Sequence, residues 1–214
     1  YPYGLVDPLE DLSALAVEKN LGLHVDGCLG GFILPWVERL GHAVPRFDFR
    51  LPGVTSISCD THKYGYALKG TSAVLYRNRQ LRRLQYFSTA DWRGGVYVSP
   101  TFQGSRSEGL TAATWAAMVT IGENGYLEAA RAIMRAAETI RAGVATIPEL
   151  TIAGAPTFLI SMLSEVVDIF HVNDYLAQRG WRLNGCQRPP GIHFCITLPQ
   201  TVPGVAERFR TGAS

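Results

Sequence analysis

The 214-residue sequence contains no apolar run that approaches the roughly 20 residues a membrane-spanning helix needs. Charge of one sign is also scarce. The 20 Lys and Arg nearly balance the 18 Asp and Glu, and the net charge of +2 is too small to indicate binding to nucleic acid or a membrane surface. No long run of basic residues alters that balance. We therefore expect neither a nucleic-acid partner nor a transmembrane segment in this chain.

Cysteine is equally sparse. The four cysteines, Cys28, Cys59, Cys186 and Cys195, form no pair with the spacing of a metal site or a redox motif. Buried, reduced thiols are typical of such isolated cysteines. We expect a cytoplasmic protein with no metal site.

The sequence lacks an initial Met and a signal peptide. Its first residues, YPYGLVDP, resemble the end of a strand. We therefore expect a fragment whose N-terminal part is absent. Apolar residues make up 47% of the chain and charged residues 18%, a composition typical of a globular protein with a sizeable core.

Alternating helical and strand patterns predict an α/β fold in the first part of the chain. Residues 7–19 have the pattern of an amphipathic helix. Short strands are expected at 22–25, 54–59 and 71–77. Connections of this kind favour a sheet covered on both faces. Glycines at 27, 30 and 31 predict a tight loop after the first strand.

Two helices should follow the polar loop GSRSEG at 104–109. The second carries an apolar stripe at steps of four and three residues, which predicts a core-facing side: Tyr126, Ala130, Ile133, Ala137, Ile140 and Val144. After Pro148 the sequence predicts further strands in ELTIAG, FLISML, WRLNG and IHFCITL, with one helix near 168–179 and another from about 205. We predict a large domain at 1–147 and an incomplete small α+β domain at 148–214.

Two clusters each end a predicted strand: HVDGCLGG at 24–31 and SCDTHKYGYALKG at 58–70. In open α/β sheets the carboxyl ends of strands face the ligand crevice, so the two clusters should meet in one site. Lys63, partly desolvated at a strand end, is expected to have a lowered pKa and to form a Schiff base with an aldehyde. Asp26 is expected to keep the pyridine nitrogen of pyridoxal 5′-phosphate (PLP) protonated. Taken alone, Lys63 could also be an ordinary solvated lysine of a loop, and Asp26 could be an ordinary turn or helix-cap residue.

Three further features could bind anions. His62 lies beside Lys63, and the loop at Gly104, Ser105 and Arg106 precedes a helix whose free N–H groups favour phosphate. Lys69 adds a second positive charge six residues after Lys63. For His62 and for the loop at 104–106, simple turn chemistry is the competing interpretation.

Several segments together resemble the sphingosine-1-phosphate lyases, within the PLP-dependent group II decarboxylase-like family of fold type I. They are HVDGCLGGF, FDFRLPGVTSISCDTHKYGYALKG, DWRGGVYVSPT, GSRSEG, GENGY and RPPGIHFCITL. The resemblance runs from Tyr1 to about Arg210. It implies an aspartate aminotransferase-like large domain, a homodimer with shared active sites, and a bacterial source.

The resemblance also implies roles for single residues. Lys63 matches the Schiff-base lysine, Asp26 its pyridinium partner, and His62 a residue near the cofactor phosphate. Gly104 and Ser105 match the loop that reaches the cofactor phosphate of the neighbouring subunit. Lys69 and Tyr1 match substrate-binding residues. The chain departs from the family at Ser107 and Glu108, where Pro–Gly is usual, and the family's ring-stacking residue and Gly–Thr phosphate loop would precede Tyr1.

The resemblance implies a carbon–carbon lyase that cleaves phosphorylated sphingoid bases to a fatty aldehyde and phosphoethanolamine. Two alternatives stay open. One is a PLP-dependent amino acid decarboxylase, which would need no site for a substrate phosphate. The other is a truncated, non-catalytic remnant of the same fold that acts as a folded partner.

Overall fold

A computed structural model describes residues 1–212, and the chain divides into two compact units. One unit spans Pro8–Asn124, and the other joins residues 1–7 to the segment from Gly125 onward. These units divide the chain at other positions than the domain boundary expected after Ile147, which stays a prediction. The mixed helices and strands agree with the predicted α/β class.

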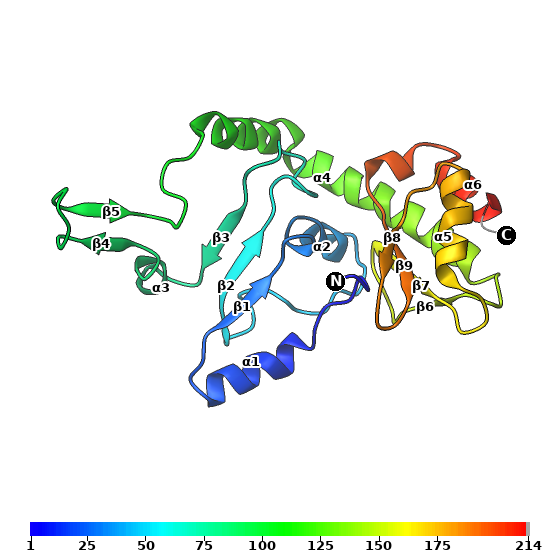
Figure 1. The fold of residues 1–214 in the computed structure, drawn as a ribbon, viewed down its shortest axis with the longest axis horizontal. Coiled ribbons are helices and arrows are strands. Elements are labelled where there is room, and N and C mark those ends of the chain that lie inside the picture. The colour runs from blue at the N-terminus through cyan, green and yellow to red at the C-terminus, as the bar shows by residue number, and fades with distance from the viewer. Residues whose placement is uncertain (213–214) are drawn as a thin grey trace. The chain divides into compact units, whose positions relative to one another are not determined.

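A three-stranded sheet forms the centre of the Pro8–Asn124 unit. Its order is β1 (Leu23–Asp26), β2 (Val54–Cys59) and β3 (Ala73–Tyr76), as Figure 1 shows. β1 and β2 are parallel, whereas β3 is antiparallel to β2. All three strands lie where the sequence predicts them. Because β1 and β2 run in the same direction, their carboxyl ends lie at the same edge of the sheet.

Two helices pack on this sheet. α1 (Leu9–Glu18) contacts β1, and α2 (Gly30–Arg39) contacts β2. α2 begins within the segment for which the sequence predicted only a tight loop, and that prediction was incomplete. The reason lies in packing: a Cβ on Gly31 would stand 2.5 Å from Sγ of Cys59. Gly31 therefore allows the helix to approach the strand closely.

The rest of this unit comprises α3 (Arg79–Arg83), a hairpin of β4 (Phe87–Thr89) and β5 (Tyr97–Ser99), and the first part of α4 (Glu108–Val144). The sequence did not predict α3 or the hairpin. The backbone of Gly122, at φ 60° and ψ −179°, interrupts α4. The segment therefore consists of two helical parts, as predicted.

The second unit contains a four-stranded antiparallel sheet. Its order is β6 (Thr151–Ile152), β7 (Leu159–Leu163), β9 (Gly191–Cys195) and β8 (Asn184–Cys186). α5 (Ile169–Gln178) packs against β9, and its first turn is capped by Asp168, whose carboxylate accepts a 2.9 Å hydrogen bond from the N–H of Phe170. A short 3₁₀ helix, η1 (Leu198–Thr201), and α6 (Val205–Gly212) complete the unit. The strands and helices predicted after Pro148 are confirmed.

The core of this unit includes the whole predicted stripe of α4. Ile133, Ala137 and Ile140 are fully buried, and Tyr126, Ala130 and Val144 are nearly so. Within residues 1–212, no helix combines the length and apolar character needed to cross a bilayer. None of the four cysteines forms a disulfide in that range; Cys59 and Cys186 are buried, and Cys28 and Cys195 are half-buried.

We expect Ile133→Ala to lower the free energy of unfolding by about 2–5 kcal/mol, because it leaves a cavity in the core. Arg131→Ala, on the exposed side of the same helix, should change it by less than about 0.5 kcal/mol. Urea unfolding of both variants measures the difference. Equal effects would contradict the assignment of this stripe to the core.

Candidate active site

Lys63 lies in a tight loop that follows β2. The N–H of Lys63 donates to the carbonyl of Asp60, and the N–H of Ala67 donates to the carbonyl of Thr61. Gly65 permits the loop to close, because a Cβ there would lie 2.4 Å from the Thr61 carbonyl oxygen. The loop folds back on itself and directs the Lys63 amine toward the strand end. There Nζ of Lys63 forms an ion pair of 2.8 Å with Oδ2 of Asp60.

The pKa of Lys63 is shifted in the direction opposite to the one expected. Partial burial is the largest single influence and opposes the charged form, but the hydrogen bonds and charges of Asp60 and Cys28 together outweigh it and raise the pKa of the amine. The prediction of a lowered pKa from desolvation was therefore wrong for this chain. Burial acts to raise the pKa of the Asp60 carboxyl. Its bonds with Lys63 and with the Ser72 hydroxyl, 2.7 Å away, act in the opposite direction, and the net effect is a lowered pKa.

Asp26 ends β1 as an ionised carboxylate. The backbone N–H of Cys28 donates to Oδ1 of Asp26 at 3.0 Å and is the largest influence on the pKa of this carboxyl, which is lowered. Partial burial opposes the shift. The side chain of Cys28, the Ser58 hydroxyl at 3.1 Å and the charge of Lys63 add to the lowering. The group therefore carries a negative charge at neutral pH.

The structure brings Lys63 and Asp26 together. Asp26 pairs in register with Ser58 of β2, and the loop carrying Lys63 begins two residues later. Lys63 is close enough to lower the pKa of Asp26 and to hydrogen-bond with the side chain of Cys28, two residues beyond Asp26. An amine and an ionised carboxylate thus share one edge of the sheet, as the sequence predicted.

His62 is oriented by the chain that follows the loop. Its Nδ1 lies 2.8 Å from the carbonyl oxygen of Thr71, so Nδ1 carries the proton and donates. Nε2 lies 3.9 Å from Oδ2 of Asp60. His62 is therefore a fixed neighbour of the Lys63–Asp60 pair.

The remaining predicted residues have no hydrogen bond or ion pair with this cluster in the part of the chain that the structure describes. Lys69 is exposed near the end of the same loop. Gly104, at φ +69°, and Ser105 lie in the loop between β5 and α4, and no hydrogen bond or ion pair links them to Lys63 among the described residues. Tyr1 belongs to the other unit, where its hydroxyl lies 3.2 Å from Nε2 of the buried His193. The proposed contacts of these residues with ligands stay predictions.

Sequence reasoning missed three contributors. Asp60 directly follows β2, and its position three residues before Lys63 could have indicated an ion pair. Ser72 binds Asp60, and Ser58 binds Asp26. Neither serine lies in a sequence pattern that predicts its bond, because each bond joins residues of different strands or loops.

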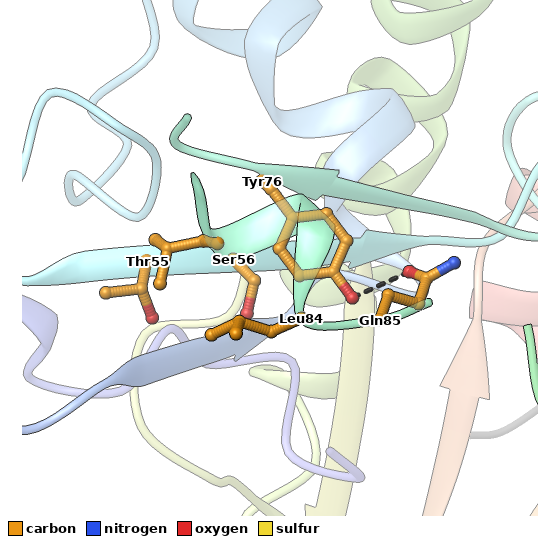
Figure 2. A pocket seen from close by; sticks show the side chains of 6 residues that line it. Thr55, Ser56, Tyr76, Leu84 and Gln85 are labelled. Atoms are coloured by element: carbon orange, nitrogen blue, oxygen red, sulfur yellow. Dashed lines mark hydrogen bonds between the residues drawn. The ribbon is translucent and has the colours of Figure 1, made fainter. Parts of the chain in front are cut away.

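A cavity of about 250 Å³ lies in this unit beside the middle of β2. Figure 2 shows its lining, where the Tyr76 hydroxyl donates to Oε1 of Gln85 at 2.7 Å. Thr55, Ser56, Leu81 and Leu84 complete the lining. None of the predicted site residues lines it, so the cavity is separate from the Lys63–Asp26 edge.

A family model, the pyridoxal-dependent decarboxylase conserved domain, matches residues 2–158. The chain belongs to this family. It is 49% identical over 211 residues to a sphingosine-1-phosphate lyase of Arabidopsis thaliana, covering 98% of this chain and 39% of that protein. It is 44% identical over 200 residues to the enzyme of that name from Saccharomyces cerevisiae, covering 92% of this chain and 34% of that protein. The chain therefore spans little more than a third of the length of these relatives.

Solved structures give the same assignment. A sphingosine-1-phosphate lyase of Burkholderia pseudomallei matches with a TM-score of 0.96 and 58% identity, covering 100% of this chain and 49% of that chain. A glutamate decarboxylase of Lactobacillus brevis matches with a TM-score of 0.79 at 21% identity, covering 99% of this chain and 51% of that one, and so shares the fold. The fold type I architecture expected from the sequence is confirmed.

The cofactor of this family is PLP, and the residues at the strand edge fit it. Lys63 offers an amine for the aldehyde, and Asp26 offers a carboxylate that is ionised before any ligand binds. The two groups are close enough to interact electrostatically, and both must be near one another to contact the same pyridine ring. The cofactor predicted from the sequence is therefore supported by both the family and the donor groups.

We expect Asp60→Asn to lower the pKa of Lys63, because the substitution removes the carboxylate that stabilises the ammonium form. The neutral, reactive amine should then be present at lower pH. In full-length protein stripped of cofactor, covalent attachment of PLP to Lys63 can be trapped by borohydride and measured by mass spectrometry across pH. Its midpoint should move to lower pH in Asp60→Asn and stay unchanged in Asp174→Asn, an exposed control on α5. A midpoint that moves to higher pH would contradict this role of Asp60.

Proposed function

We propose that the full-length protein is a PLP-dependent carbon–carbon lyase. Its substrates would be phosphorylated sphingoid bases such as sphingosine 1-phosphate, cleaved to a fatty aldehyde and phosphoethanolamine. One observation carries the proposal: the Lys63–Asp26 edge occurs in a chain whose similarity to sphingosine-1-phosphate lyases extends over nearly its whole length. The reaction balances without an added reactant, because the hydroxyl hydrogen of the substrate ends on the carbon released as phosphoethanolamine.

When bound, PLP supplies an electron-poor ring that accepts the electron pair of the breaking bond between C2 and C3. Lys63 would hold the cofactor through its amine and give way to the amine of the substrate. Asp26 would keep a proton on the ring nitrogen, and its lowered pKa supports this role because the carboxylate is charged throughout the neutral range. Asp60 would hold the amine of Lys63 when that amine is free.

Binding of the two phosphate groups is assigned to other residues. We infer that His62, Gly104 and Ser105 contact the cofactor phosphate and that Lys69 and Tyr1 contact the substrate. The exposed ammonium of Lys69, six residues after Lys63, supports attraction of a phosphate dianion. The Thr71 carbonyl fixes the orientation of the His62 ring through Nδ1, and a bond from Nε2 to a phosphate oxygen requires a hydrogen on Nε2 as well.

We also propose a homodimer. Apolar side chains gather on the β4–β5 hairpin and its flanks, and single monomers rarely expose such patches. The exposed members include Phe87 at 59%, Trp92 at 54%, Val96 at 77% and Val98 at 59%. The loop with Gly104 and Ser105 directly follows this hairpin, so a second copy covering the hairpin would bring that loop close to the partner. The predicted cytoplasmic location and bacterial source stay predictions.

Cleavage of a phosphorylated sphingoid base by the full-length protein tests the function. We expect release of fatty aldehyde and phosphoethanolamine, with no turnover by Lys63→Ala. Lys69→Gln should raise KM for the phosphorylated base about 10-fold, because a charge-assisted hydrogen bond to phosphate is lost, while Lys69→Arg should retain most of the affinity. Lyase activity of Lys63→Ala would contradict the proposal. Release of CO2 from amino acids, with no preference for phosphorylated substrates, would favour the decarboxylase alternative.

The dimer is tested by Val96→Asp, which would place an unpaired charge in the proposed interface. We expect the dissociation constant of the full-length dimer to rise at least about 10-fold, because a buried, uncompensated charge is strongly unfavourable. Val166→Asp, a valine of the other unit that is 75% exposed against 77% for Val96, serves as the control. Sedimentation equilibrium measures both, and an unchanged dimer in Val96→Asp would count against this interface.

A further inference from the structure

Polar side chains form a row on one face of the β1–β2 pair. In β1, Val25 is buried, whereas His24 and Asp26 on either side of it are exposed. Their in-register partners in β2 are Ser56 and Ser58. Since side chains of a strand alternate between faces, these four lie together on the face opposite to Val25.

Hydrogen bonds connect the row from end to end. Nδ1 of His24 lies 2.8 Å from Oγ of Ser56, and Nε2 of the same ring lies 3.3 Å from Oγ of Ser58. Oγ of Ser58 lies 3.1 Å from Oδ1 of Asp26. His24 therefore bridges the two serines, and the second serine joins it to the carboxylate.

The chemistry of the groups determines the direction of these bonds. Ionised Asp26 can only accept, so Ser58 must use its single hydroxyl hydrogen to donate to Oδ1. Oγ of Ser58 can then only accept from His24, which requires a hydrogen on Nε2. In the neutral ring Nδ1 is consequently an acceptor, and the Ser56 hydroxyl donates to it. All donors in the row point toward Asp26.

We propose that Ser58 and His24 are positioning residues that fix the carboxylate of Asp26 for the cofactor. The inference rests on the proposed function, because it assigns them to the PLP-binding role of Asp26. Each bond in the row polarises the next, so His24 strengthens the bond that Ser58 donates. With the N–H of Cys28, the row places two donors on one oxygen of Asp26 and restricts rotation of the carboxylate.

The row has no comparable use as a stabilising element. Its members are exposed or half-buried, and hydrogen bonds between such groups largely replace bonds to water. The bonded row ends on the one carboxylate of β1. Its geometry therefore affects the position of Asp26 more than it affects folding.

The test uses the full-length protein and PLP as the titrant. Ser58→Ala should weaken PLP binding about 10-fold, because a hydrogen bond to a charged group is lost. Ser58→Thr, which retains the hydroxyl, should stay within about 3-fold of the original protein. His24→Leu should act in the same direction as Ser58→Ala but less strongly, and Ser56→Ala least. Ser164→Ala, a half-buried serine of the other unit that donates to the carbonyl of Glu149, is the matched control.

A second readout does not depend on the cofactor. In the cofactor-free protein, ¹⁵N spectra of the His24 ring should show the tautomer with hydrogen on Nε2, and Ser58→Ala should alter them. If the original protein binds PLP but Ser58→Ala binds it equally well, or if His24 carries its hydrogen on Nδ1, the inference is overturned and the proposed function is not. If the original protein does not bind PLP, both are overturned.

Discussion

The parallel pairing of β1 with β2 is the constraint on which the site depends. Parallel neighbours end at the same edge, so the residues that follow each strand must meet there. Asp26 is the last residue of β1, and the register places it beside Ser58 of β2. A slip of one residue would turn Asp26 and His24 to the buried face, where Val25 packs. Burial of Val25 and Ile57 on that face therefore fixes the carboxylate of Asp26 on the opposite face of the sheet.

Two carboxylates share the neighbourhood of one lysine, and the structure gives them different partners. Asp60 forms the direct ion pair with Lys63, whereas Asp26 is held mainly by the N–H of Cys28 and by neutral side chains. The charge of Lys63 contributes least to the lowered pKa of Asp26, so the carboxylate depends only weakly on the lysine. This separation matters because an amine must give up its proton before it can attack an aldehyde, and Asp26 must stay ionised when that happens.

The sequence allowed the strands, the two clusters and the core stripe of α4 to be predicted, because each depends on local periodicity or on residues adjacent in the chain. The pKa shift of Lys63 was predicted in the wrong direction, since it depends on how the loop returns the amine to Asp60. α2 was missed because glycines usually indicate turns, whereas Gly31 serves close packing against Cys59. The hydrogen-bonded row could not be predicted for a related reason. The serines of β2 bond His24 and Asp26 only because the strand register places them opposite these residues.

The Lys63–Asp26 pair by itself does not select a substrate. The same architecture occurs in a glutamate decarboxylase with only 21% identity, so the fold cannot distinguish cleavage between two carbons from loss of a carboxylate. Discrimination must come from groups that contact the part of the substrate that differs, which is a phosphate in one case and a carboxylate in the other. Both are anions, but the phosphate lies farther from the reacting carbon and carries more charge. The proposed role of Lys69 rests on this difference, because Lys69 is an exposed cation six residues after the reactive amine.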